Sequence, residues 1–260
     1  MASLPNSGVM KKHISKLGDV TIAARRFGAH CCRYYGNHPG FKKLEINAHV
    51  NGELAGVLHA YEVIVPDIIK RGGYFHLGDV FDEDSALSEM CTFVYGTYPL
   101  GLGYAVRDRG RRWKTFSKDF QKLAVNFDSY SKPTHQDRWS DWSHTLIYVE
   151  SVEVYPAYRN AGIGSMLVEG IGKDPRSMKD AFVVLKCYPF ELGFDEGEES
   201  SFIREGRDSL AKFYTGQGFV ASKGNYWMLH TRAQLFGRSK LRCKQERKLI
   251  KSDEKMRLGA

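Results

Sequence analysis

Hydrophobic residues recur at regular intervals along this 260-residue chain, and the interval differs from one part to another. Residues 42–50 and 54–65 are rich in isoleucine, valine, leucine and tyrosine, which predicts two strands. The Asn51-Gly52 pair between them suits the positive φ angles of a tight turn, so the two strands are expected to form a hairpin. Residues 20–27 form a similar run and predict an earlier strand.

Helical spacing occurs twice in the long segment from about residue 70 to residue 143. Asp84 suits the position that caps a helix, and after it Leu87, Met90 and Val94 fall on one face. Farther on, apolar residues at intervals of three and four predict a second helix with an aromatic stripe in the core; they are Trp113, Phe116, Phe120, Leu123 and Phe127. The glycine-rich, basic residues 95–112 between the two helices predict a surface loop.

Strand and helix patterns alternate from residue 145 onward. The order is a strand over 144–154, a helix over 162–171, a strand over 181–190, a helix over 208–218, and short strands near 219–222 and 225–231. This alternation is typical of a βαβ arrangement, in which helices pack on a sheet. The sequence therefore predicts an α/β fold of the α+β type, with a mixed sheet.

Composition favours a folded chain in a reducing compartment. With 42% hydrophobic and 26% charged residues, the chain can bury a large core. No apolar run approaches the roughly 20 residues that cross a bilayer, and the polar start lacks a signal-peptide core, so we expect a cytoplasmic protein without a membrane partner. The cysteines lack CxxC pairs and interleaved histidines, so neither disulfides nor a metal site are expected; they are Cys31, Cys32, Cys91, Cys187 and Cys243.

The net charge of +8 is concentrated at the C-terminal end. Residues 238–257 contain nine lysines and arginines against three acidic residues. Such a segment binds nucleic acid or an acidic partner through charge neutralisation, or it is a solvated terminal helix. Both interpretations stay open at this point.

The stretch YRNAGIG, residues 158–164, joins the strand that ends at Val154 to a helix with one apolar face. The first N–H groups of a helix have no partner within the helix, and they lie at the positive end of its dipole. An anion is therefore stabilised there without a catalytic side chain. Glycine permits a close approach, and Arg159 adds a positive charge, so the turn predicts an anion site.

The same turn resembles the acyl-CoA motif of the GNAT family of N-acetyltransferases, Q/R-x-x-G-x-G/A. A second element supports the resemblance, because the family places a helix with a tyrosine ahead of a Gly-Phe pair and this chain has AKFYTGQGFV at residues 211–220. The resemblance covers about residues 145–231, and the Asn51-Gly52 hairpin fits the family's earlier strands. It implies the GNAT acyl-CoA N-acyltransferase fold, with a large insertion in the middle of the chain.

The resemblance also implies roles for individual residues. The turn would bind the pyrophosphate of acetyl-CoA, the cosubstrate, and the preceding strand would offer backbone groups to the pantetheine arm. Tyr214 would be the general acid that protonates the departing CoA thiolate. The implied cofactor-binding residues are Val152, Glu153, Val154, Arg159, Asn160, Ala161, Gly162, Ile163, Gly164 and Ser165.

Acyl transfer to an amine also requires a group that removes a proton, because only the uncharged amine attacks a thioester. Glu150 is the first candidate, since it shares strand parity with Val152 and Val154 and the family carries an acid on this strand. His144 is the alternative base. Glu153 points to the opposite face of the strand and is expected to be a surface residue.

The middle of the chain departs from the family pattern. The family places two helices between its first and second strands, whereas this chain has its helical patterns within residues 70–143. Either the acceptor-side helices have moved, or a large insertion covers the mouth of the active site. We expect one GNAT-like domain over residues 1–237 and a basic tail over residues 238–260. The oligomeric state is open, a homodimer included.

The resemblance thus implies an acyl-CoA-dependent N-acetyltransferase that moves an acetyl group directly from acetyl-CoA to a primary amine. The acceptor, a small molecule or a macromolecule, is not identified. Acidic residues within 191–205 would attract a cationic amine or form a solvated loop. The alternative function is a GNAT-fold binding protein that contacts nucleic acid or a protein partner through its basic tail and residues 107–112.

Overall fold

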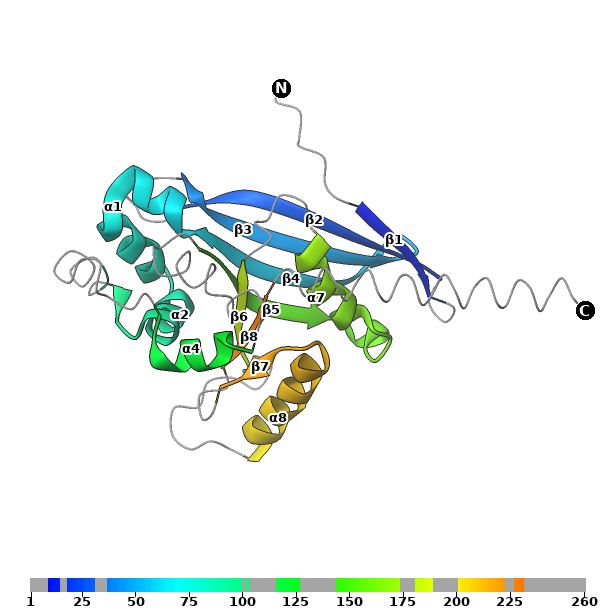
Figure 1. The fold of residues 1–260 in the computed structure, drawn as a ribbon. Helices are drawn as coiled ribbons and strands as arrows, with labels where there is room; N and C mark the ends of the chain where they lie inside the picture. The colour runs from blue at the N-terminus through cyan, green and yellow to red at the C-terminus, as the bar shows by residue number, and fades with distance from the viewer. Residues whose placement is uncertain are drawn as a thin grey trace, which may run out of the picture.

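A computed structural model describes residues 9–14, 18–30, 37–99, 102, 116–126, 144–173, 181–188, 201–222 and 227–231. Eight strands of these residues form one sheet in the order β1-β2-β3-β4-β5-β6-β8-β7, and helices pack on both of its faces (Figure 1). The predicted α/β class with a mixed sheet is confirmed. None of the helices in these ranges combines the length and the apolar character that a membrane crossing needs.

The first four strands are antiparallel neighbours. They are β1 (Val9–Ile14), β2 (Gly18–His30), β3 (Asn37–Val50) and β4 (Glu53–Ile64). The predicted hairpin is confirmed, because β3 and β4 flank a turn in which Asn51 and Gly52 have φ angles of 52° and 93°. The predicted strand over 20–27 is part of β2, whereas β1 is not predicted by the sequence pattern.

The second half of the sheet contains its parallel pair. β5 (Thr145–Val154) lies parallel to β6 (Phe182–Lys186), and α7 (Ile163–Lys173) connects them. Because adjacent parallel strands need a crossover connection, this unit confirms the predicted βαβ arrangement. After β6 come α8 (Ser201–Gly216), β7 (Val220–Ala221) and β8 (Trp227–Thr231), and β8 lies antiparallel to both β6 and β7.

Two hydrophobic cores lie on the two faces of the sheet. The first core lies against α1 (Val65–Asp82), α2 (Ser85–Tyr95) and α4 (Lys118–Ala124), and its large residues include Phe41, Phe81, Phe93, Phe116, Phe120, Tyr148 and Phe182. The second core lies against α7 and α8 and includes Ile22, Ile46, Leu58, Val149, Leu167, Tyr214 and Phe219. The helices α1, α2 and α4 lie together at one end of the sheet, and α7 crosses it (Figure 1).

The middle segment therefore contributes directly to the core. The helix predicted after Asp84 is confirmed as α2, and the carboxylate of Asp84 accepts the Ala86 N–H at 2.7 Å. Sequence analysis does not predict α1, because Pro66 reads as a break. Proline is tolerated in the first helical turn, where its missing N–H would have no helical acceptor, and Pro66 lies in that turn.

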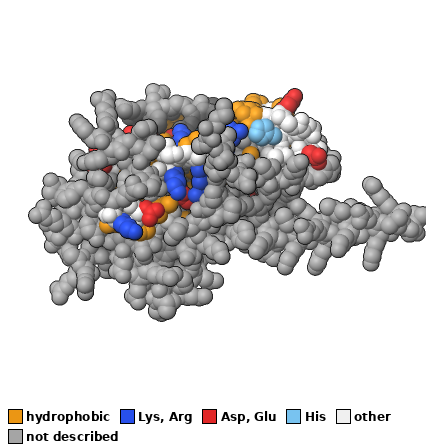
Figure 2. All heavy atoms as spheres, turned by 90° about the horizontal axis from the view of Figure 1, so that it is seen from above, with side chains coloured by type: hydrophobic (Ala, Val, Ile, Leu, Met, Phe, Trp, Pro, Cys, Tyr) orange, Lys and Arg blue, Asp and Glu red, His pale blue; other side chains and the backbone are white. Residues whose placement is uncertain are grey.

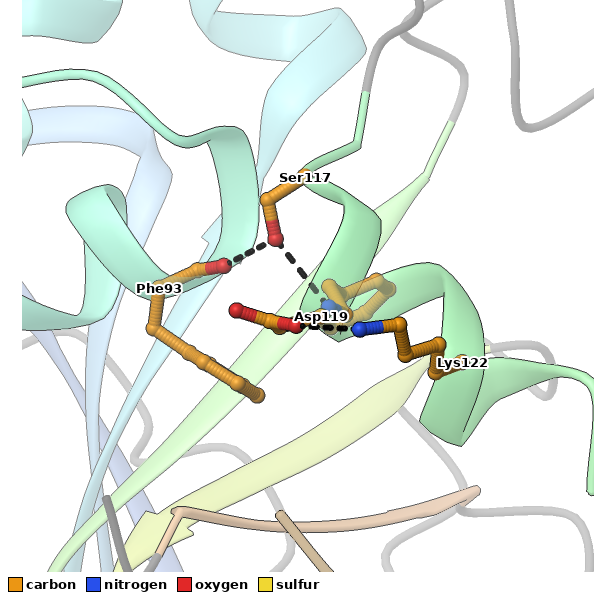
Figure 3. A network of polar contacts seen from close by, with 5 residues as sticks. Phe93, Ser117, Asp119 and Lys122 are labelled. Atoms are coloured by element: carbon orange, nitrogen blue, oxygen red, sulfur yellow. Dashed lines mark hydrogen bonds and ion pairs between the residues drawn. The ribbon is translucent and has the colours of Figure 1, made fainter. Parts of the chain in front are cut away.

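The second predicted helix is shorter than expected and begins at a specific cap. Ser117 Oγ accepts the Phe120 N–H at 3.0 Å and donates to the Phe93 carbonyl at 2.6 Å (Figure 3). One hydroxyl thus caps α4 and joins it to α2. Phe116, Phe120 and Leu123 are buried as predicted, whereas Trp113 and Phe127 lie outside the described residues.

Candidate functional site

A gap in strand pairing lies at the C-terminal half of β5. Among the described residues, β5 pairs with β6 from Leu146 to Val149 only, while its pairing with β4 continues to Val154. Backbone groups of successive residues in a strand point to opposite edges, and the Tyr155 N–H points toward β4, where it donates to the Ala55 carbonyl at 3.0 Å. The N–H and C=O groups of Val154, and by alternation those of Val152, therefore point to the edge that β6 has left. An extended ligand can form hydrogen bonds with the backbone groups of such an edge, in the same way as an additional strand.

A β-bulge marks the place where β5 and β6 separate. In the pairing of β5 with β4, Val149 lies opposite Ala60 and Ser151 lies opposite His59, so Glu150 is the additional residue. A bulge of this kind bends the strand and re-aims a side chain.

The bulge determines the face of the sheet on which Glu150 lies. Val149 before the bulge, and Val152 and Val154 after it, all pack on the second core. In a regular strand, two residues on the same face are separated by one residue, but Val149 and Val152 are separated by two, Glu150 and Ser151. Both of these residues therefore lie on the opposite face, that of the first core. The prediction that Glu150 shares the parity of Val152 and Val154 is therefore wrong, because parity counting assumes a strand without a bulge.

The surroundings of Glu150 agree with this placement. Burial raises the pKa of Tyr148, and the charge of Glu150 raises it further. The same two causes, in the same order, act on Tyr61, whose pKa rises to about 12. Both tyrosines pack on the first core. Glu153 is exposed, as predicted, but it lies on the same face as Glu150.

The turn from β5 to α7 has the geometry of an anion site. A short 3-10 helix, Pro156–Tyr158, precedes Asn160 and Gly162, whose φ angles of 61° and 83° lie in the left-handed region. The Gly162 carbonyl accepts the Met166 N–H at 3.1 Å, which is the helical bond of the first turn. The N–H groups of residues 163–165 precede that bond, and those of a first helical turn have no intrahelical acceptor.

The two glycines of the turn have different roles. A side chain at Gly162 would meet nothing within 4 Å, so this position opens to solvent and its glycine serves the positive φ angle. A side chain at Gly164 would meet the Phe213 ring at 3.3 Å and Val154 at 3.6 Å. Gly162 therefore suits the approach of an anion, whereas Gly164 permits α8 and β5 to pack against the first turn of α7.

Arg159 and Ser165 are fixed at the two ends of the turn. Arg159 Nε donates to the Val154 carbonyl at 3.0 Å, which folds this exposed side chain back along the open edge of β5. Ser165 Oγ accepts a hydrogen bond from Gln217 Nε2 at 2.9 Å. Ala161 is partly buried and the Ile163 side chain lies in the second core, so the backbone of these residues is the part that faces a ligand.

Tyr214 lies on the second-core side, near the end of β6. Its side chain is 7% exposed and its ring contacts those of Phe213 and Phe219, at centroid distances of 4.9 Å and 5.6 Å. Burial raises the pKa of Tyr214, and Cys187, which directly follows β6, raises it further. Tyr214 therefore keeps its proton at neutral pH, and it lies near Cys187, two residues beyond Leu185, the last β6 residue that pairs with β5.

Cys187 and His144 do not belong to the chemistry of this site. Cys187 is buried beside Met228 Sδ, 3.0 Å from its sulfur, and burial raises its pKa to about 12, so a thiolate is strongly disfavoured. His144 is buried among aromatic residues of the first core, where its Nε2 lies 2.8 Å from the Tyr95 hydroxyl. The alternative of His144 as base is not supported by this placement.

The structure packs α8, the helix that carries Tyr214, against the turn and β5 through Phe213 and Gly164. It also adds two features that sequence analysis missed. The bulge at Glu150 and the Ser165–Gln217 bond both depend on which residues become neighbours after folding. Most of the acidic loop, the basic residues 107–112 and the tail over 238–260 lie outside the described residues.

Comparison with models of known protein families finds no match to this chain, and comparison with curated proteins likewise finds no matching relative. The functional argument therefore depends on the geometry of this site.

Proposed function

We propose that this protein is an N-acetyltransferase of the GNAT type, which moves an acetyl group from acetyl-CoA to a primary amine. One observation carries the proposal: the open edge of β5 is followed, after the turn over residues 155–162, by a helix N-terminus. The backbone groups of Val152 and the N–H of Val154 suit an extended amide-containing arm. Farther along the chain, the first N–H groups of α7 suit a diphosphate.

Each part of acetyl-CoA would meet a matching part of the site. The diphosphate would bind at the N–H groups of residues 163–165, with room above Gly162. The pantetheine arm would lie along the edge from Val154 toward the bulge, a span of about 13 Å for four residues at roughly 3.3 Å each. The thioester would then lie where β5 and β6 separate, between the two faces of the sheet.

In the proposed chemical step, Glu150 and Tyr214 would act from the two opposite faces of the sheet. Glu150, on the first-core face, would accept a proton from the incoming ammonium group, directly or through a water molecule. The free amine attacks the thioester carbon, the C–N bond forms and the C–S bond breaks. The acylated nitrogen then loses its extra proton to water. Tyr214, which burial keeps protonated, would supply the proton that converts the departing thiolate to a thiol. Tyr214 regains a proton from water after the step.

The proposal is tested by ligand binding and by turnover, measured separately. Titration of the protein with coenzyme A in a calorimeter should show saturable binding, and replacement of Gly162 by aspartate, which puts a negative charge at the turn, should abolish it. Release of free thiol from acetyl-CoA in the presence of an amine should require Tyr214, with Tyr214→Phe retaining the binding. Absence of coenzyme A binding to the folded wild-type protein at millimolar concentration would overturn the proposal.

A further inference from the structure

A groove lies on the first-core face of the sheet, on the side where Glu150 points. Its volume is about 410 Å³, which is in the range of small-molecule sites. Three neighbouring strands and the junction between α1 and α2 form its walls. The lining residues are Phe27, Gly28, Ala29, Phe41, Lys43, Tyr61, Glu83, Asp84 and Leu87.

Aromatic rings form one wall of the groove. The rings of Phe41 and Tyr61 are stacked, with centroids 5.4 Å apart and planes 17° apart. The ammonium group of Lys43 lies 5.6 Å from the centroid of the Tyr61 ring, within cation–π distance. The groove thus already holds one primary ammonium group against an aromatic ring.

Carboxylates lie beside the same ring. Glu83 and Asp84 line the groove, and Glu150 lies on the neighbouring strand β5, on the same face. All three raise the pKa of Tyr61, after the larger effect of burial, so their negative charge reaches its hydroxyl. Opposite them is a single lysine among the lining residues, which leaves this region negative. Figure 2 shows one face of the molecule, on which Lys and Arg side chains and Asp and Glu side chains of the described residues both appear.

We propose that the acceptor is a small aliphatic diamine or polyamine, whose reacting amine lies at Glu150 and whose second ammonium group occupies the groove between Tyr61 and the Glu83–Asp84 pair. This inference rests on the proposed function. An aromatic face and two carboxylates favour a cation over a neutral or anionic group, because both act through negative potential. A compact groove of this volume suits a free amine better than a folded protein.

The strand spacing sets the length of the acceptor. Glu150 is on β5, Tyr61 on β4 and Lys43 on β3, and neighbouring strands lie about 4.8 Å apart. Tyr61 lies opposite Tyr148, two residues before Glu150, so an offset of about 6.6 Å along the strand adds to the strand spacing. The two amines of the acceptor are therefore about 8–10 Å apart. With C–C bonds of about 1.5 Å in an extended zigzag, roughly five to seven methylene groups span this distance.

The test compares linear diamines with monoamines of equal chain length, in steady-state assays with acetyl-CoA. For chains of about five to seven methylenes, kcat/KM for the diamine should exceed that for the monoamine by about tenfold or more, the size of one ionic hydrogen bond. The double variant Glu83→Gln with Asp84→Asn should remove this advantage, so that kcat/KM for the diamine falls toward that for the monoamine. Asparagine at residue 84 still caps α2, so the fold is kept. Asp119→Asn, at an exposed acid on α4 outside the groove, is the matched control.

A substitution of Lys43 is expected to change diamine binding in the opposite direction, toward tighter binding. If the groove binds a cation, Lys43→Gln removes a competing ammonium group, and KM for the diamine should fall several-fold. A rise in KM would mean that Lys43 helps to hold the acceptor instead of competing with it, and it would overturn the proposal.

Two further results would also overturn the proposal without affecting the proposed function: equal kcat/KM for diamines and monoamines, and a preference for lysine-containing peptides over every diamine. If no amine is acetylated although coenzyme A binds, titration of the protein with 1,5-diaminopentane tests directly whether the groove binds a diamine. Binding that the double variant loses supports the groove, and absence of binding overturns it. Failure of the proposed function has a different signature, the absence of coenzyme A binding.

Discussion

Gln217 and Ser165 are joined by a hydrogen bond of 2.9 Å, from Gln217 Nε2 to Ser165 Oγ. Ser165 lies in the first turn of α7, and Gln217 directly follows α8, the helix that carries Tyr214. Phe213 packs against Gly164 beside this bond. The proposed diphosphate site and the proposed acid are therefore held in a fixed relation by contacts between two helices that are distant in the sequence.

This link predicts coupling between the two helices. Gln217→Ala and Ser165→Ala should each lower the free energy of unfolding by about 1 kcal/mol, and the double variant should lose less than the sum of the single variants. Urea denaturation of the four proteins measures the coupling. Additive losses would show that the bond contributes no interaction energy.

Gly162 should be the most restrictive position of the turn. Gly162→Ala must hold an L-residue at a φ angle of 83°, which costs about 1–2 kcal/mol although a side chain there has open space. Gly162→Asn should cost less, because asparagine tolerates the left-handed region. Gly216→Ala, at a helical glycine that also has open space, is the control and should be neutral or stabilising. Equal stability of Gly162→Ala and wild type, in chemical denaturation, would contradict this account.

Glu150 and Glu153 offer a matched pair on one face of β5. Glu150→Gln should lower kcat for amine acetylation by about 10²- to 10⁴-fold, the usual contribution of a general base, and leave the affinity for coenzyme A unchanged. Glu153→Gln, at the exposed acid three residues farther along the strand, should retain most of the activity. Equal effects of the two substitutions would remove Glu150 from the role of base.

Ser117 should stabilise the middle segment through two bonds. Ser117→Ala removes the cap of α4 and the bond to the Phe93 carbonyl, so we expect a loss of about 1–2 kcal/mol in the free energy of unfolding. Ser117→Asp keeps an acceptor for the cap but places a carboxylate beside that carbonyl, and should therefore restore only part of the loss (Figure 3). Full recovery with aspartate would show that the bond to Phe93 contributes little.

His144 should make the protein sensitive to mild acid. Burial lowers its pKa to about 3, so the unfolded chain, with an ordinary histidine pKa near 6.5, binds the proton first. The stability that the neutral ring contributes is present above pH 6.5 and declines as the pH falls toward 3, by up to about 1.4 kcal/mol per pH unit. His144→Gln should have a flatter profile between pH 4 and pH 7 in urea denaturation. An identical slope in the variant and the wild type would contradict the assignment.

The sequence predicted correctly those elements that depend on residues close together in the chain. The turn at Asn51-Gly52, the cap at Asp84 and the apolar face of α7 each depend on residues close together in the chain, and each is found as predicted. The helix α1 was missed, because the same proline that begins a helix also reads as a break. The start of α4 depended on a cap, Ser117, that the aromatic spacing does not reveal.

The features of the candidate site also separate into those that depend on local sequence and those that depend on tertiary contacts. The sequence by itself determined the glycine turn and the tyrosine helix, since φ preferences and helix dipoles are local properties. Only the tertiary structure decided the face on which Glu150 lies, because a bulge is defined by the residues of the partner strand. It also decided the groove, whose walls come from three strands and a helix junction. Contacts between distant residues depend on strand register and packing, which no spacing within one segment specifies.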